Sequence, residues 1–141
     1  MPSRKLEDLH PIVAERARRL IALAETEGIE ILVTSTLRTF EEQAELFAIG
    51  RTKPGKKVTN ARPGESWHNF GLAFDVVPLV NGKAIWDSPF WGRIGALGKQ
   101  AGLLWGGDFK SFKDKPHFEF HPNLTLAEAR RRRENNAELL A

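Results

Sequence analysis

Apolar residues repeat at helical spacing early in the chain and then give way to a β-branched run. Pro11 is favoured at the first position of a helix, and the apolar positions that follow it are Val13, Ala17, Leu20, Ile21 and Ala24. Gly28 is typical of a helix end. The run "IEILVTST", from Ile29 to Thr36, is short and rich in β-branched residues, so it predicts a buried strand.

A second helix and a long polar loop follow this strand. Thr39 and Glu42 have the spacing of a capping box, which predicts a helix that continues through Phe47 and ends at Gly50. The next segment, "RTKPGKKVTNARPGE" from Arg51 to Glu65, is rich in Lys, Pro and Gly. A loop of this length is uncommon in a compact domain, so we expect it to have a function, such as covering a bound substrate.

The rest of the chain combines short strands with two more helices. "GLAFDVVPLV" and "KAIW" have strand character, and the Asn81-Gly82 dipeptide between them is typical of a hairpin. The other expected elements are a helix from about Phe90 to Ala101, a strand at "LLW", a Gly/Lys loop from Gly106 to Lys115, a strand at "HFEFH", and a polar C-terminal helix capped by Thr125 and Glu128. This order predicts an α+β fold in which helices flank a small, mainly antiparallel sheet.

Composition and charge narrow the possible chemistry. The chain has 141 residues, of which 41% are hydrophobic and 28% charged, and this balance fits one globular domain. It contains no cysteine, so any zinc site must use His, Asp or Glu. The net charge is +3, and much of the excess lies in Arg130 to Arg133. We interpret this run as a solvated helix face, with binding of the cell wall or of nucleic acid as the alternative.

Three side chains have the chemistry of a catalytic zinc site. His68 and Asp75 flank a glycine-containing turn in "ESWHNFGLAFD", and His117 lies on the last expected strand. Two imidazoles and one carboxylate leave a fourth position for water, which is typical of catalytic rather than structural zinc. The separation of His68 and Asp75 is odd, so one regular strand would direct them to opposite faces. We therefore expect a bend at Gly71 that lets both contact one metal ion.

Other polar residues close to these positions could act on a substrate. Asp114 precedes His117 by three residues, and Pro116 disfavours a helix between them, so we expect Asp114 to lie in a loop beside the metal as the general base. Glu119 is the rival base, and in a strand it shares a face with His117 and His121. We expect Glu119 to hold a histidine from behind, and His121 remains the alternative third ligand.

Two motifs resemble those of a known enzyme family. "SWHNFGLAFD" looks like the Ser-x-His-x-x-Gly-x-Ala-x-Asp motif of the zinc D-Ala-D-Ala peptidases (peptidase family M15, the VanY and VanX group), and "DKPHFEF" resembles their Asp/Glu-x-x-His motif. The stretch "STLRTFEEQAELFAIGRTKPGKKVTNARPGESWH" is similar to the L-alanyl-D-glutamate endopeptidase branch, which includes phage endolysins. The similarity extends from about Leu6 to Asn123, and it implies the α+β fold shared with the zinc-binding domain of hedgehog proteins.

The resemblance also implies a role for each matching position. The metal ligands fall on His68, Asp75 and His117, the catalytic base on Asp114, the substrate or transition-state arginine on Arg38, and the positions expected close to substrate on Ser66 and Gln43. Arg38 follows the predicted strand "ILVTST", where a guanidinium that points into a cleft can bind a carboxylate or a developing oxyanion.

These motifs predict a zinc metallopeptidase that hydrolyses peptidoglycan stem peptides at the L-Ala–D-Glu bond and acts as a phage endolysin in host cell lysis. The alternatives are a D-Ala-D-Ala carboxypeptidase or dipeptidase, and a zinc-containing wall-binding module without turnover. We expect residues 1–124 to form the catalytic domain and residues 125–141 a polar helix of the same domain, without a separate wall-binding domain.

The expected partner is bacterial peptidoglycan, with no binding of nucleic acid and no stable association with a membrane, and the expected state is a monomer. No apolar segment resembles a signal peptide or could span a bilayer, so we expect synthesis in the host cytoplasm and action at the cell wall after release.

Overall fold

The elements lie close to where the hydrophobic pattern predicts them in this computed structural model, which describes residues 2–140. The helices are α1 (Pro11–Thr26), α2 (Phe40–Ala48), α3 (Trp91–Gln100) and α4 (Leu126–Glu134), with short 3-10 turns η1 (Leu6–Asp8), η2 (Trp67–Phe70) and η3 (Gly106–Asp108). The strands are β1 (Glu30–Ser35), β2 (Ala73–Val80), β3 (Lys83–Ala84), β4 (Leu104–Trp105) and β5 (His117–Glu119).

Local signals explain where the first helices begin and end. Pro11 opens α1, and the imidazole of His10 caps it by accepting a backbone hydrogen bond. Gly28 follows α1 with a φ of 74°, a left-handed conformation that favours glycine. The predicted capping box of α2 is confirmed, since the side chain of Thr39 accepts from the backbone of Glu42 and the Glu42 carboxylate accepts from the backbone of Thr39.

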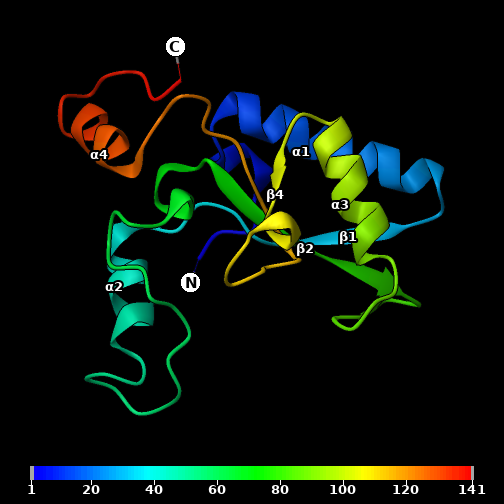
Figure 1. Ribbon diagram of the computed structural model, residues 1–141, viewed down its shortest axis with the longest axis horizontal. Coiled ribbons are helices and arrows are strands. Elements are labelled where there is room, and N and C mark those ends of the chain that lie inside the picture. Colours follow the sequence, from blue (N-terminus) through cyan, green and yellow to red (C-terminus); the bar gives the residue numbers. More distant parts are fainter. Residues whose placement is uncertain (1, 141) are drawn as a thin grey trace.

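The described part of the chain forms an antiparallel sheet with the strand order β1-β2-β5-β4, and β3 pairs with β2 (Figure 1). The predicted hairpin at Asn81 and Gly82 joins β2 to β3. Strand β5 ends at Glu119, earlier than the alternating "HFEFH" pattern predicts. Both of its partners begin directly opposite Glu119, β2 at Ala73 and β4 at Leu104, so the two ladders end there and His121 lies beyond the sheet.

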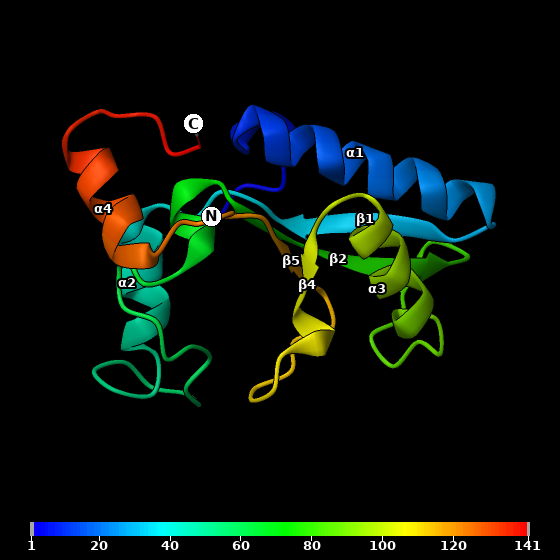
Figure 2. The ribbon, with the colours of Figure 1, turned by 45° about the horizontal axis from the view of Figure 1, so that its top comes forward.

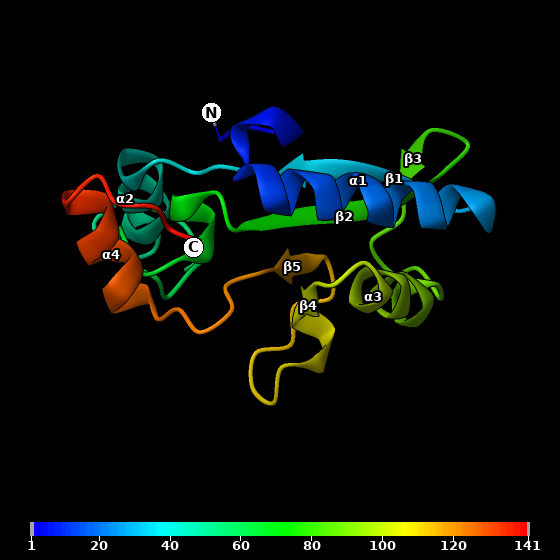
Figure 3. The ribbon, with the colours of Figure 1, turned by 90° about the horizontal axis from the view of Figure 1, so that it is seen from above.

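One face of the sheet is covered by helices. α1 lies across β1 and β2, and α3 packs against α1 and β4 (Figures 2 and 3). Phe74 of β2 and Phe118 of β5 are fully buried on this side and stack with their ring centroids 5.7 Å apart. Gly98 of α3 allows the close approach, because a Cβ at this position would come within 2.2 Å of the Phe118 ring.

The opposite face of the sheet holds polar side chains. Asp75 and His117 are the neighbours of Phe74 and Phe118 along their strands, so they project from the other side. α2, the 51–65 loop and the segment that follows η3 extend from this side, away from α1 (Figure 2). Within residues 2–140, none of the helices combines the length and the apolar character needed to cross a membrane.

Candidate metal centre and active site

The structure brings His68, Asp75 and His117 together. Asp75 and His117 are direct partners in the register of β2 and β5. His68 Nε2 lies 3.3 Å from one Asp75 carboxylate oxygen, and His117 Nδ1 lies 3.1 Å from the other. One ligand atom from each residue falls within 4.8 Å of the other two, close enough to hold a single metal ion. Two imidazole nitrogens and one carboxylate oxygen are a donor set that suits zinc.

A turn between His68 and Asp75 brings both side chains to this centre. His68 lies on η2, and Gly71 ends η2 with a φ of 68° before the chain enters β2. The predicted bend at Gly71 is therefore confirmed. The Nδ1 atom of His68 is 2.8 Å from the carbonyl oxygen of Thr36, so this nitrogen donates its proton there and Nε2 keeps a lone pair for a metal.

Glu119 holds His117 from behind. The Nε2 atom of His117 lies 2.7 Å from one Glu119 carboxylate oxygen, and the second oxygen contacts Nε2 of His121. Trp67 stacks on the His121 ring, with the centroids 3.9 Å apart. His121, the alternative third ligand, thus lies behind Glu119, and Asp75 occupies the place beside the two histidines of the centre.

Electrostatic coupling within the centre favours cation binding. Burial alone would lower the pKa of His117, but its hydrogen bonds to Asp75 and Glu119 raise that pKa to about 10. Burial alone would raise the pKa of Asp75, yet the hydrogen bonds from both histidines hold it well below its usual range. Burial would likewise raise the pKa of Glu119, but hydrogen bonds from His117 and His121 lower it to about 2. Without a metal, His117 therefore carries a proton between two carboxylates at neutral pH.

Asp114 lies in the loop before β5, as expected. Its backbone N–H donates to the Gly106 carbonyl at 2.9 Å, and its own carbonyl accepts from His117 N at 3.1 Å. Partial burial of the carboxyl group raises the pKa of Asp114 above its ordinary value, although the residue as a whole remains solvent-exposed. Gly106 is a neighbour that the sequence did not indicate.

Arg38 and Ser66 lie in the same pocket as the centre. This pocket has a volume of about 370 Å³, and its walls are formed by Arg38, Leu46, Val58, Thr59, Ser66, His68, Asp75, Asp114 and His117. The Ser66 hydroxyl also caps η2 by accepting from His68 N at 3.3 Å. Within residues 2–140, the Nε atom of Arg38 is buried without a hydrogen-bond partner, although Arg38 as a residue lines the pocket.

Gln43, which was expected close to substrate, lies behind Arg38 instead. Its side chain is fully buried, and its amide oxygen accepts from Arg38 Nη1 at 3.0 Å. Its amide nitrogen donates to the carbonyl oxygen of Ala61 in the 51–65 loop at 2.8 Å. In this structure the Gln43 side chain is covered on all sides, and its contacts are with Arg38 and the 51–65 loop.

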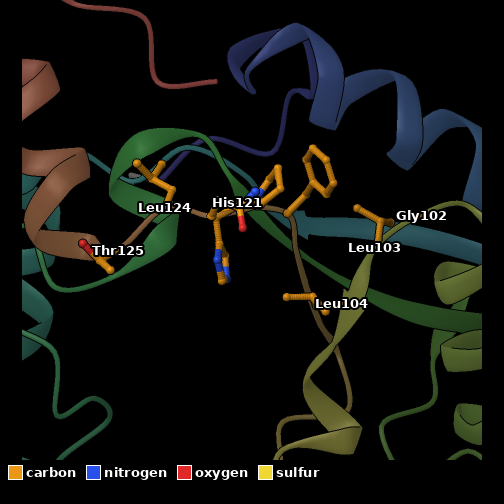
Figure 4. A pocket seen from close by; sticks show the side chains of 9 residues that line it. Gly102, Leu103, Leu104, His121, Leu124 and Thr125 are labelled. Carbon is orange, nitrogen blue, oxygen red and sulfur yellow. The ribbon is translucent and has the colours of Figure 1, made fainter. Parts of the chain in front are cut away.

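A larger pocket, of about 690 Å³, lies outside this centre (Figure 4). It opens where β4 and the segment after β5 diverge, and Leu103, Leu104 and Leu124 contribute to its mainly apolar wall. His121 also borders it, so the imidazole that contacts Glu119 separates this pocket from the centre.

Three arginines of α4 donate to main-chain carbonyls, so the run Arg130 to Arg133 is only in part the solvated face that the sequence indicates. Arg132 Nη1 donates to Leu139 O at 2.8 Å. Arg130 Nη1 donates to Gly64 O at 2.9 Å. Arg133 Nη1 donates to Asn69 O at 3.1 Å, and its guanidinium lies over the ring of Phe40, 4.4 Å from the centroid. These contacts fasten α4 to η2 and to the end of the 51–65 loop.

Comparisons with known proteins point to one family. A family profile described as D-alanyl-D-alanine carboxypeptidase matches residues 59–120. The peptidoglycan L-alanyl-D-glutamate endopeptidase CwlK of Bacillus subtilis (strain 168) is 45% identical over 126 residues, which cover 82% of this chain and 75% of that protein. The L-alanyl-D-glutamate peptidase of Listeria phage A118 is 33% identical over 109 residues, which cover 74% of this chain but 35% of the phage protein.

A solved structure supports the same assignment. The L-Ala D-Glu endopeptidase ChiX of Serratia marcescens matches with a TM-score of 0.63 and 25% identity, over 85% of this chain and 88% of that one. The predicted α+β fold with its small antiparallel sheet is therefore confirmed both by the arrangement of the elements and by this likeness.

Proposed function

Because this chain belongs to peptidase family M15, we propose that it is a zinc peptidase that cleaves the L-Ala–D-Glu bond of peptidoglycan stem peptides. The observation that carries the proposal is the pocket in which His68, Asp75 and His117 meet Asp114 and Arg38. The relatives from Bacillus subtilis and from the Listeria phage support the choice of bond.

The residues of the pocket have distinct roles in this reaction. His68, Asp75 and His117 would hold zinc, which when bound supplies a Lewis acid that polarises the scissile carbonyl and makes water more acidic. Asp114 accepts a proton from the water that attacks the carbonyl carbon, and it returns this proton to the nitrogen of D-Glu as the C–N bond breaks. The products are a peptide with a new L-Ala carboxylate and a peptide with a free D-Glu amine.

Arg38 provides the positive charge on the substrate side of the pocket. Burial lowers the pKa of Arg38 and the nearby Asp75 carboxylate opposes this shift, so the guanidinium remains charged at neutral pH. Arg38 lines the pocket, so its guanidinium can bind a carboxylate of the D-Glu residue or the oxyanion that develops at the scissile carbonyl. Ser66, also on the pocket wall, is the further candidate for contact with the stem peptide.

Digestion of purified peptidoglycan tests the proposal. We expect the zinc-loaded protein to release new amino groups, and mass spectrometry to place them on D-Glu. Asp114→Ala should lower the rate by at least about 100-fold while the zinc content stays at the wild-type level. Release of free D-Ala would establish the carboxypeptidase alternative instead. A zinc-loaded wild-type protein that releases no new amino groups would instead be a wall-binding module.

The role in host cell lysis is a further part of the proposal, because relatives of this chain include both a bacterial and a phage enzyme. An endolysin must reach the wall after synthesis inside the cell. We expect cells that express the protein in their cytoplasm to stay intact until the membrane is permeabilised, and then to lyse at a rate that depends on Asp114. Lysis that is unchanged in the Asp114→Ala variant would contradict this role.

A further inference from the structure

Two buried side-chain amides, Gln43 and Asn69, connect Arg38 to the candidate metal centre. We propose that this amide pair is a positioning device, which fixes the Arg38 guanidinium relative to His68 and to the 51–65 loop. The inference rests on the proposed function, in which Arg38 binds the substrate. It assigns to Gln43 and Asn69 no contact with substrate and no part in proton transfer.

Gln43 holds the guanidinium end of Arg38. Its amide oxygen accepts from Arg38 Nη1 at 3.0 Å and from Asn69 Nδ2 at 3.4 Å. Its amide nitrogen donates to the Ala61 carbonyl at 2.8 Å and lies 3.5 Å from the Thr59 hydroxyl. Thr59 forms part of the pocket wall. Gln43 therefore joins the guanidinium to the loop that borders the substrate.

Asn69 holds the backbone of Arg38 and the far end of the same loop. Its amide nitrogen donates to the Arg38 carbonyl at 3.0 Å, and its amide oxygen accepts from Gly64 N at 3.0 Å. Arg38 N also donates to the His68 carbonyl at 3.0 Å. Asn69 follows His68 on η2, so these hydrogen bonds fix the position of Arg38 relative to the helical turn that carries a candidate metal ligand.

The pair is suited to a fixed geometry. Both amides are fully buried, and each of their oxygen and nitrogen atoms has a hydrogen-bond partner, so neither can rotate without leaving a buried polar group unpaired. A free arginine side chain has considerable rotamer entropy to lose on binding. The Gln43 acceptor removes part of that freedom before substrate arrives.

A double-mutant cycle separates positioning from a general structural role. Gln43→Met keeps the length of the side chain and removes the acceptor for Arg38. We expect it to lower kcat/KM by about 10- to 100-fold in the wild-type background, through misplacement of the guanidinium. The same substitution should have less than a twofold effect in an Arg38→Ala background. Gln100→Met, at an exposed position of α3, is the matched control and should leave kcat/KM unchanged.

An equal loss in both backgrounds would overturn the proposal, because Gln43 would then act on the fold or on the metal rather than through Arg38. Zinc content and the thermal midpoint, measured on all four proteins of the cycle, show whether folding or metal loss contributes. The wild-type rate tests the proposed function separately. If the wild-type protein is inactive, the proposed function fails and the cycle cannot be measured, but the relaxation experiment below still tests the positioning of Arg38.

The motion of the Arg38 side chain can be measured without turnover. We expect ¹⁵N relaxation to show a rigid Arg38 Nε–H group in the wild-type protein and a mobile one in Gln43→Met. Gln43→Glu provides the second variant, because it keeps an acceptor for Arg38 and loses the donor to Ala61. It should leave Arg38 rigid while the 51–65 loop becomes mobile. A rigid Arg38 in a folded Gln43→Met protein would refute the positioning role.

Discussion

Gly106 gives the sharpest test of how the Asp114 loop supports the reaction. A Cβ at Gly106 would lie 2.2 Å from the backbone oxygen of Asp114 and 3.0 Å from Cβ of His117. Ordinary contacts between carbon and oxygen begin at about 3.3 Å, so Gly106→Ala requires the Asp114 backbone to move by about 1 Å. A displacement of this size in an active site can cost about 100-fold in rate, and we expect this loss in kcat/KM for peptidoglycan hydrolysis.

The effect can be assigned to Asp114 with two further variants. Gly92→Ala is the matched control, since in the described structure a Cβ on this exposed glycine of α3 meets no atom within 4 Å. It should keep full activity and gain about 0.4–1 kcal/mol of stability. In an Asp114→Ala background, Gly106→Ala should cost little more. A folded, zinc-replete Gly106→Ala enzyme with kcat/KM within twofold of wild type would refute the reasoning.

Three more predictions concern the metal and the core. The raised pKa of His117 stabilises the metal-free protein below pH 6.5, and this contribution is lost as the pH rises towards 10. Zinc must displace that proton, so calorimetry in buffers of different ionisation enthalpy should show proton release at pH 7 and tighter binding at pH 8 than at pH 6. Glu119→Gln should weaken zinc binding by about 10- to 100-fold in competition with a chelator. Leu20→Ala, in the fully buried face of α1, should lower the free energy of unfolding in urea by about 2–5 kcal/mol without changing zinc affinity.

The features that could be predicted from the sequence are those with a local physical cause. The capping box at Thr39 starts a helix wherever the surrounding chain lies, and the bend at Gly71 follows from an odd separation between two residues that must meet. The end of β5 was not predictable in the same way. Alternation continues to His121, but a strand needs partners, and the positions where β2 and β4 begin decide where the ladders stop.

The role of a buried polar group depends on partners that are distant in sequence. Asn69 stands in an apolar stretch, where nothing nearby shows that its amide pairs with Arg38 and Gln43, 31 and 26 residues away. The arginines of α4 were also difficult to interpret. A run of charges is usually solvated, and nothing near these residues in the sequence shows which of them bind the main chain.

Whether such a cation stays in water depends on the carbonyls that the fold places beside it. Arg130 and Arg133 meet carbonyl oxygens of Gly64 and Asn69, 66 and 64 residues away. Both acceptors belong to the segment that also carries His68. Arginines of α4 therefore stabilise the segment from Gly64 to Asn69 at its surface, while the buried amide of Asn69 stabilises it from the interior. An arginine that is bound to the main chain keeps its charge, but it has fewer N–H groups free for direct contact with a cell wall or a nucleic acid.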